Sequence, residues 1–281
     1  MIEFEKALDA ILRNAKRLGV EKASLEDSMG RVLTEDVCSK INMPPFDKSA
    51  MDGYALNYKD AQRIPAQLKC TGFIQAGEMF TKKVSPGECV KIMTGAGLPK
   101  GADSVVMVED TSSSESYVEI CKSAKKHRNI CFKGEDVKIG QKVIEKGKTL
   151  SVSDMALLAS IGRRFAWVVK KPRVAVLNTG GEIVPLGRKL KSREIYNSNG
   201  PQLMALLKKD GIGARYLGIA KDRPKELKSS LEKGLENDVL LVSGGVSMGD
   251  YDLVPEILME LGVKKIFHNV RTKPGKPLFF G

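Results

Sequence analysis

The sequence predicts a multidomain protein of class α/β plus β. Three observations support this prediction. After residue 172, short apolar runs alternate with amphipathic segments at helical spacing, a pattern typical of a doubly wound, mostly parallel α/β domain with right-handed crossovers. Between about residues 64 and 137, short extended runs are separated by glycine and proline, which indicates a small β-rich domain. A chain of 281 residues is long enough for more than one domain.

The β-rich domain is expected to be inserted into a discontinuous helical and extended linker domain. An amphipathic helix opens the chain, because apolar residues from Ile2 to Leu18 recur at helical spacing and Gly19 ends the pattern. Ser151 is expected to cap a second helix, which Gly162 ends. The predicted domains are residues 1–43 with 138–170 (linker), 44–137 (β-rich insertion) and 171–281 (α/β).

Within the α/β domain, the periodicity of apolar residues gives the expected elements. Strands are expected at residues 173–177, 214–219, 239–242, 264–270 and 278–280. Helices are expected at residues 201–209, 224–235 and 253–261. Asp222, before Arg223 and Pro224, is expected to be the N-cap of the second helix.

The formal net charge of +12 raises the question of nucleic-acid binding. However, the lysines are scattered, and the basic cluster at residues 122–128 contains no interleaved aromatic side chains. A solvated basic loop, or attraction of a small polyanionic ligand, explains this cluster better. We therefore expect no nucleic-acid partner.

The cysteine pattern and the hydropathy bear on the cellular compartment. The five cysteines are odd in number and form no Cys-x-x-Cys pair, which argues against a disulfide framework and a zinc site and fits a reducing cytosol. No apolar run approaches the length that spans a membrane. The sequence predicts a cytoplasmic protein without a membrane partner.

A glycine-rich stretch after a buried strand is the first candidate site. Residues 239–242 form a short apolar run flanked by β-branched valines, and Ser243, Gly244 and Gly245 interrupt it. A strand end, a glycine turn and a helix start together suit a phosphate or a metal-bound anion. Ser247 adds a hydroxyl, and Asp250 and Asp252 add carboxylates. The alternative is a tight strand-to-helix connection with Asp252 as an N-cap.

Other predicted strands end in polar loops of the same kind, and ligands of such sheets bind outside the carboxyl ends of the strands. Glu182 follows the first strand, Asp222 the second, and Lys273 and Lys276 the fourth. Carboxylates suit a hard cation such as Mg²⁺, and lysines suit an oxyanion. Asp222 as a plain helix cap and the lysines as surface charges remain alternatives.

Two loops of the β-rich region also carry candidate side chains. Residues 43–56 combine two prolines with a polar run and an Asp52-Gly53 turn signal. Such a loop either contacts a ligand or links two domains. Thr94 lies in a glycine-rich loop, and Asp136 is either a site residue or a surface acid.

Taken together, six segments resemble those of the molybdopterin molybdenumtransferases, the family of MoeA proteins and the gephyrin E domain. The resemblance runs through the whole chain in the same order. The segments are Pro-Pro-Phe-Asp-Lys-Ser-Ala-Met-Asp-Gly-Tyr-Ala, Ile-Met-Thr-Gly-Ala, Asn-Thr-Gly-Gly-Glu, Tyr-Asn-Ser-Asn, Ser-Gly-Gly-Val-Ser-Met-Gly-Asp-Tyr-Asp and Lys-Pro-Gly-Lys-Pro.

The resemblance implies an activity. The enzyme would take adenylylated molybdopterin and molybdate as substrates, use Mg²⁺, insert molybdenum at the dithiolene and release AMP. It would be a homodimer whose site lies between the α/β domain of one subunit and the β-rich domain of the other. A molybdopterin adenylyltransferase would be the partner that supplies the substrate.

The resemblance also implies roles for individual residues. Catalytic roles fall on acids and one threonine: Asp52, Thr94, Asp136, Glu182, Asp222 and Asp252. Glu182 and Asp250 would hold the Mg²⁺. The pterin-phosphate and nucleotide loop would contain Ser243, Gly244, Gly245 and Ser247, and Lys273 and Lys276 would hold molybdate.

The sequence departs from the family at two places. Gly181 stands where the family often has an acid, and the chain stops at Gly281 where family members continue. We therefore expect a chain truncated at its C-terminus. The alternative function is a molybdopterin-binding or scaffold protein without turnover. A third possibility, an adenylyltransferase-like or CinA-like enzyme that shares only the α/β domain, is disfavoured by the segment at residues 44–55 and by the β-rich insertion.

Overall fold

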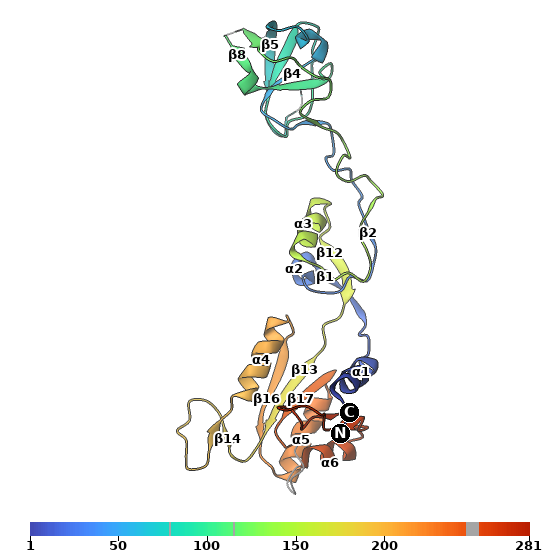
Figure 1. The fold of residues 1–281 in the computed structure, drawn as a ribbon, viewed down its shortest axis with the longest axis vertical. Helices are drawn as coiled ribbons and strands as arrows, with labels where there is room; N and C mark the ends of the chain where they lie inside the picture. The colour runs from blue at the N-terminus through green and yellow to red at the C-terminus, as the bar shows by residue number, and fades with distance from the viewer. Residues whose placement is uncertain (79, 115, 246–252) are drawn as a thin grey trace. The chain divides into compact units, whose positions relative to one another are not determined.

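The computed structural model describes residues 1–78, 80–114, 116–245 and 253–281. The chain divides into two compact units, Met1–Lys22 with Trp167–Gly281, and Ala23–Ala166. It passes from one unit to the other within β1 (Val20–Ser24) and β12 (Phe165–Val169) (Figure 1). The linker domain, expected as a third part, stays a prediction. Among the described residues, no helix is both long and apolar enough to span a membrane.

A three-stranded parallel sheet forms the centre of the first unit (Figure 1). Its middle strand is β13 (Val174–Thr179), all six residues of which are buried. On one side β13 pairs with β16 (Ala214–Ala220), and on the other with β17 (Val239–Ser243). The parallel arrangement predicted for these three strands is confirmed. Because the strands are parallel, their carboxyl ends lie at one edge of the sheet.

Helices cover both faces of this sheet. They are α4 (Asn199–Lys209), α5 (Pro224–Leu235) and α6 (Leu253–Glu260). Leu177 and Asn178 are successive residues of β13 and so point to opposite faces. Leu177 packs in one cluster with Leu227 and Leu231 of α5. A Cβ on Gly200 of α4 would lie 2.5 Å from Asn178 Oδ1, so α4 covers the other face, as in a doubly wound sheet.

The last two expected strands do not extend this sheet. They are short, β18 (Phe267–His268) and β19 (Phe279–Phe280), and they pair antiparallel with each other. Asn269 has a left-handed backbone with φ of 70°, which ends the extended run directly after His268. The expected strand at residues 264–270 is therefore wrong in length, and it is not a fourth parallel strand.

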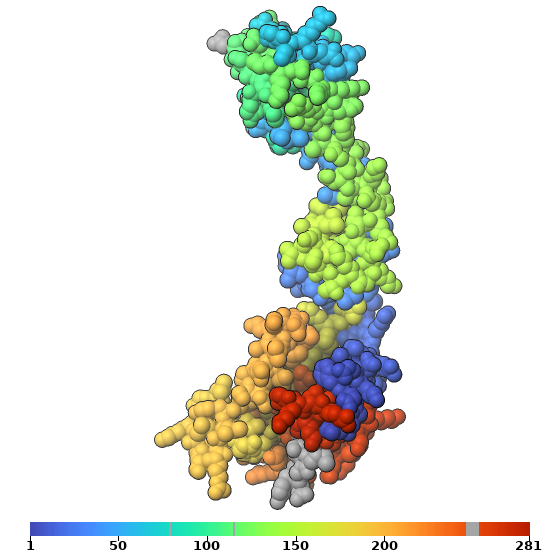
Figure 2. Space-filling view, in the orientation of Figure 1, coloured from blue at the N-terminus to red at the C-terminus, as the bar shows by residue number. Residues whose placement is uncertain are grey.

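The N-terminal helix packs against the β18–β19 segment. It is α1 (Phe4–Asn14), shorter than the expected helix because the backbone of Ala15 is already extended. Ala7 forms a cluster with Phe267 and Val270. Figure 2 shows the N-terminal residues in blue against the C-terminal residues in red. The two ends of the chain thus share one small core.

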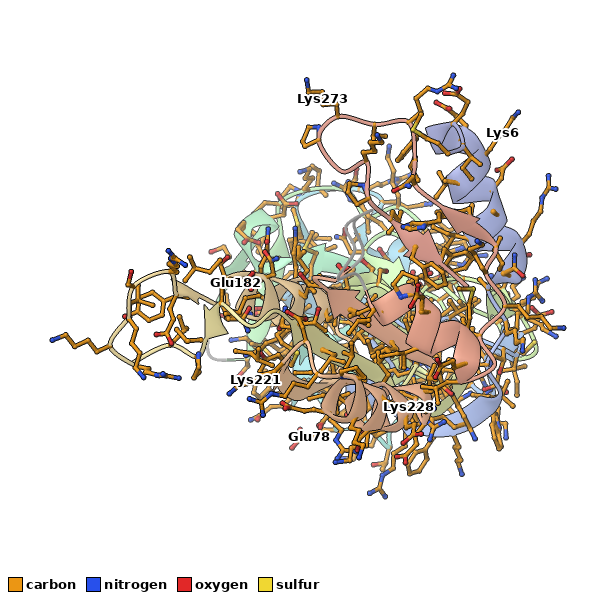
Figure 3. The ribbon with its side chains drawn as sticks, turned by 90° about the horizontal axis from the view of Figure 1, so that it is seen from below. Lys6, Glu78, Glu182, Lys221, Lys228 and Lys273 are labelled. Atoms are coloured by element: carbon orange, nitrogen blue, oxygen red, sulfur yellow. The ribbon has the colours of Figure 1, made fainter. Side chains whose placement is uncertain are left out.

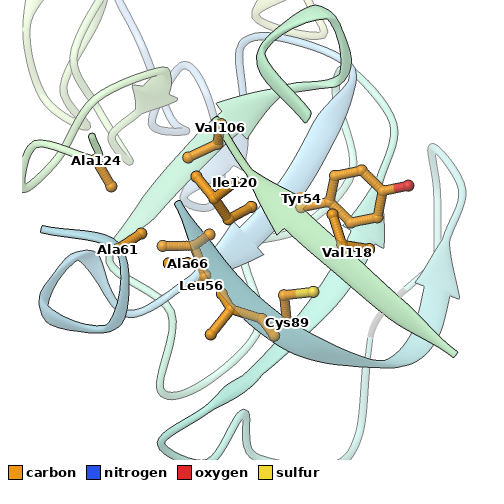
Figure 4. Packing of buried hydrophobic residues seen from close by; sticks show 10 residues of the cluster. Tyr54, Leu56, Ala61, Ala66, Cys89, Val106, Val118, Ile120 and Ala124 are labelled. Atoms are coloured by element: carbon orange, nitrogen blue, oxygen red, sulfur yellow. The ribbon is translucent and has the colours of Figure 1, made fainter. Parts of the chain in front are cut away.

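The second unit contains a six-stranded sheet, in agreement with the predicted β-rich region. Its order is β7-β4-β6-β5-β9-β8. The strands are β4 (Gly53–Leu56), β5 (Ala66–Ile74), β6 (Glu88–Ile92), β7 (Ser104–Met107), β8 (Thr111–Ser113) and β9 (Tyr117–Ile120). Figure 4 shows the core on one face, which includes Tyr54 and Leu56. Ala55, between them, belongs to a second cluster, so both faces of β4 are buried.

Shorter elements complete the second unit. Two antiparallel pairs join β2 (Val37–Cys38) to β11 (Lys142–Ile144), and β3 (Lys48–Ser49) to β10 (Ile130–Cys131). Two short helices are α2 (Leu25–Ser28) and α3 (Val152–Ser160), and two 3-10 turns are Tyr58–Ala61 and Val108–Asp110. Ser151 and Asp154 form a capping box at the start of α3, which confirms the cap predicted there.

Candidate functional site

Two carboxylates lie beside the glycine turn where the central strand β13 ends. The backbone N–H of Gly181 donates to Asp222 Oδ2 at 3.0 Å. A Cβ on Gly180 would lie 3.0 Å from Glu182 Oε2, and a Cβ on Gly181 would lie 3.8 Å from Asp222 Oδ2. The side chains of Glu182 and Asp222 therefore both lie beside this turn, as expected for neighbouring strand ends.

Asp222 is not the N-cap of α5. Arg223 occupies the cap position without a side-chain hydrogen bond, and Pro224 begins the helix. Asp222 lies one residue earlier, which directs its carboxylate to Gly181 instead of the helix amides. The cap expected from the sequence is thus wrong, and the expected association of Asp222 with the strand-end loops is observed.

The Ser243-Gly244-Gly245 turn is packed directly on β13. A Cβ on Gly244 would overlap the carbonyl oxygen of Thr179, and one on Gly245 would lie 2.8 Å from Val254 Cγ2. Both glycines have positive φ, 103° and 62°. Only glycine both lacks a Cβ and readily adopts a positive φ. Ser243 Oγ accepts a hydrogen bond of 2.8 Å from Asn199 Nδ2, which ties the turn to the start of α4.

Three predicted site residues lie outside the described residues: Ser247, Asp250 and Asp252. Of the predicted Mg²⁺ ligands, only Glu182 is described. Within the described ranges, no group of three or more histidine, cysteine or acidic side chains is arranged to hold a metal. Mg²⁺ generally takes one or two protein carboxylates and completes its shell with water and phosphate oxygens. Glu182 and Asp222, both beside the Gly180-Gly181 turn, supply carboxylates of the kind that such an ion takes.

Lys273 and Lys276 lie in the loop between β18 and β19, as Figure 3 shows for Lys273. Both are exposed, and Val270 N–H donates to the Lys276 carbonyl at 2.9 Å. Their expected place after a fourth parallel strand is wrong, because β18 pairs with β19 instead of joining the sheet.

The second unit brings Asp52 and Thr94 together. Asp52 Oδ1 accepts hydrogen bonds from the hydroxyl and the backbone N–H of Thr94, each at 2.7 Å. These two bonds, the hydroxyl first, hold the pKa of Asp52 below its ordinary value of 3.8. The Asp52 carbonyl accepts from the N–H of Val108, the first residue of the 3-10 turn Val108–Asp110, so this turn and the Thr94 loop both fix the position of Asp52. Asp136 is exposed, and its N–H donates to the Met43 carbonyl.

Sequence reasoning missed an asparagine network beside the strand ends. Asn197 Nδ2 donates to Asn178 Oδ1 at 3.1 Å and to the Tyr216 hydroxyl at 2.6 Å. Asn197 Oδ1 accepts from Gly200 N–H, which fixes the first turn of α4. A signal was present, because two of the quoted segments, Asn-Thr-Gly-Gly-Glu and Tyr-Asn-Ser-Asn, supply these asparagines.

Fold and site together define a class of protein: a parallel α/β unit with carboxylates and glycine turns at its strand ends, combined with a six-stranded β unit. Residues 2–162 match the family model of the MoeA N-terminal region (domain I and II). Residues 175–281 match that of a probable molybdopterin binding domain. The chain belongs to the molybdopterin molybdenumtransferase (MoeA) family, a family of transferases.

Individual relatives support this assignment. The molybdopterin molybdenumtransferase of Staphylococcus aureus is 36% identical over 282 aligned positions, which cover 98% of this chain and 67% of that protein. Its Staphylococcus epidermidis counterpart is 35% identical. A solved molybdopterin biosynthesis MoeA protein from Pyrococcus horikoshii has 35% identity and a TM-score of 0.79, covering 99% of this chain and 71% of that one. The chain thus spans about two thirds of the length of these relatives.

Proposed function

We propose that this protein inserts molybdenum into molybdopterin. Its substrates would be adenylylated molybdopterin and molybdate, and it would release AMP in a Mg²⁺-dependent reaction. The main support is that Glu182 and Asp222 both lie beside the Gly180-Gly181 turn, in a chain whose C-terminal part matches a probable molybdopterin binding domain.

Positioning and electrostatics would supply the catalysis. Glu182 and Asp250 would hold Mg²⁺, which when bound neutralises charge that develops on the phosphoanhydride. The Ser243-Gly244-Gly245 turn would receive the pterin phosphate and nucleotide, aided by Ser247. Lys273 and Lys276, both exposed cations, would attract and hold molybdate. Asp222 and Asp252 would complete the acidic side of the site.

We further propose that the protein acts as a homodimer in the cytoplasm. Asp52, Thr94 and Asp136 would then face the α/β unit of a second subunit, and a molybdopterin adenylyltransferase would supply the substrate. The support for this arrangement is that the Asp52 carboxylate is exposed to solvent and already fixed by Thr94. It is therefore preorganised and open to a partner.

The test is AMP release from adenylylated molybdopterin by the 281-residue chain, with Mg²⁺ and with or without molybdate. We expect molybdate-dependent release that Glu182→Ala abolishes and that Glu232→Ala, an exposed acid of α5, leaves unchanged. Equal loss in both variants would contradict the role of Glu182. Tight substrate binding without any release would instead support a binding or scaffold function.

A further inference from the structure

Thr179, the last residue of β13, places a buried hydroxyl at the edge of the candidate site. The residue is 1% exposed, and within the described part of the chain Thr179 Oγ1 has no hydrogen-bond partner. A buried polar group without a partner destabilises the folded state, and such groups are rare in native proteins. Its presence at the edge of the candidate site therefore calls for a functional explanation.

The hydroxyl faces the backbone of the glycine turn. It lies 2.8 Å from the position that a Cβ on Gly244 would take, and 3.0 Å from that on Gly245. Because both residues are glycines with positive φ, their peptide groups can rotate through conformations that other residues rarely adopt. A modest rotation would change which backbone group of the turn faces Thr179 Oγ1.

The start of the turn, in contrast, is held in place. Ser243 pairs with Asn178 in the parallel ladder between β17 and β13. Its side chain also accepts the hydrogen bond from Asn199. The turn therefore has one end fixed by side-chain and ladder contacts at Ser243, whereas Gly244 and Gly245, which lie beside the Thr179 hydroxyl, have no side chains to anchor them.

We propose that Thr179 is a positioning residue for ligand binding. When the phosphate of the nucleotide binds at the strand ends, the Gly244-Gly245 turn rotates, and one of its backbone groups forms a hydrogen bond with the Thr179 hydroxyl. The inference rests on the proposed function, which supplies the nucleotide ligand. The hydroxyl then destabilises the free protein and stabilises the complex.

The test compares thermal unfolding of the full chain without ligand and with AMP plus Mg²⁺. Thr179→Val removes the hydroxyl at nearly constant shape. Without ligand, we expect the unfolding temperature of Thr179→Val to equal or exceed that of the wild type. The increase in unfolding temperature that AMP causes should be smaller, by the amount that about tenfold weaker AMP binding produces. Thr179→Ser keeps the hydroxyl and should retain the shift.

A matched control is Thr111→Val, because Thr111 Oγ1 already donates to the Val108 carbonyl at 2.8 Å. This variant should lower the ligand-free midpoint and leave the AMP-induced shift intact. A lower ligand-free midpoint for Thr179→Val would show that the hydroxyl is already paired, and would overturn the proposal. An unchanged AMP-induced shift in Thr179→Val would overturn it as well.

Failure of the proposed function would look different. In that case the wild-type chain itself would show no shift with AMP and Mg²⁺, and the ligand-dependent role of Thr179 would fall with it. The ligand-free comparison between wild type and Thr179→Val would still show whether the hydroxyl is unpaired in the free protein.

Discussion

Asp52 Oδ1 receives two hydrogen bonds of 2.7 Å from a single residue, Thr94, one from its backbone N–H and one from its hydroxyl. The two residues lie on different loops of the second unit, 42 positions apart. Both donors favour the ionised carboxylate, and they lower its pKa below 3.8. Asp52 is therefore a fixed anion at neutral pH.

Removing the Thr94 hydroxyl should raise the pKa of Asp52. We expect Thr94→Val to move it toward 3.8, and Thr94→Ser to keep it low, as measured by carboxyl carbon NMR titration. Because the folded-state pKa is lowered, the stabilisation from ionised Asp52 is present above pH 3.8 and lost as the pH falls through the folded-state value. An identical titration in wild type and Thr94→Val would contradict this.

Gly53 should not tolerate a side chain. A Cβ there would overlap the Val106 carbonyl oxygen and lie 3.0 Å from Met107 Cα, both backbone atoms of the paired strand β7. We expect Gly53→Ala to lower the free energy of unfolding by about 3 kcal/mol, the upper end of the usual cost of overpacking, because a paired strand cannot move away.

The matched control is Gly97→Ala in the same unit, where the nearest atoms to a new Cβ lie at 3.8 Å. This change should stay within about 0.5 kcal/mol of wild type. Denaturant unfolding measures both variants. Equal stability of the two would show that β4 and β7 are less closely paired than the structure has them.

Because of Asp154, the stability of the protein at the start of α3 should depend on pH. Burial disfavours its charge, but hydrogen bonds from Lys148 Nζ at 2.6 Å and from Ser151 outweigh that effect and lower its pKa below 3.8. We expect Asp154→Asn to cost about 1–2 kcal/mol at neutral pH. The difference from wild type should shrink as the pH falls through the lowered pKa. A pH-independent difference, in urea unfolding at pH 7 and pH 3, would contradict the ionic role.

Residues of two subunits should complement each other if the site is shared. Asp52→Ala and Glu182→Ala are each expected to abolish AMP release. In a mixed dimer, one site combines the intact Glu182 of one chain with the intact Asp52 of the other. Random exchange should therefore restore about a quarter of wild-type activity. If tagged chains co-purify after mixing and activity stays absent, the shared site is wrong.

The sequence predicted much of the first unit because local signals and packing agree there. The bounds expected for α5 match, since Pro224 starts the helix and Leu227 and Leu231 mark its buried face. The parallel strands follow from the same alternation. The pairing of β18 with β19 could not be predicted in this way, because apolar patterning does not distinguish a fourth parallel strand from a local antiparallel pair.

The sequence predicted which residues belong to the candidate site, but it did not predict the contacts between them. Glycine-rich loops at strand ends indicated Glu182 and Asp222, but the hydrogen bond from Gly181 depends on how two loops meet. The buried network of Asn178 and Asn197 was missed because asparagine in a polar loop has no periodicity to reveal it. Such contacts depend on tertiary structure.

The proposed molybdenum insertion is tested most directly by product stoichiometry. The chain would be incubated with adenylylated molybdopterin, molybdate and Mg²⁺, and both free AMP and pterin-bound molybdenum would be measured. Insertion coupled to AMP release predicts equal molar amounts of the two, both lost in Glu182→Ala. AMP released without pterin-bound molybdenum would contradict the proposed function and leave only hydrolysis of the adenylylated substrate.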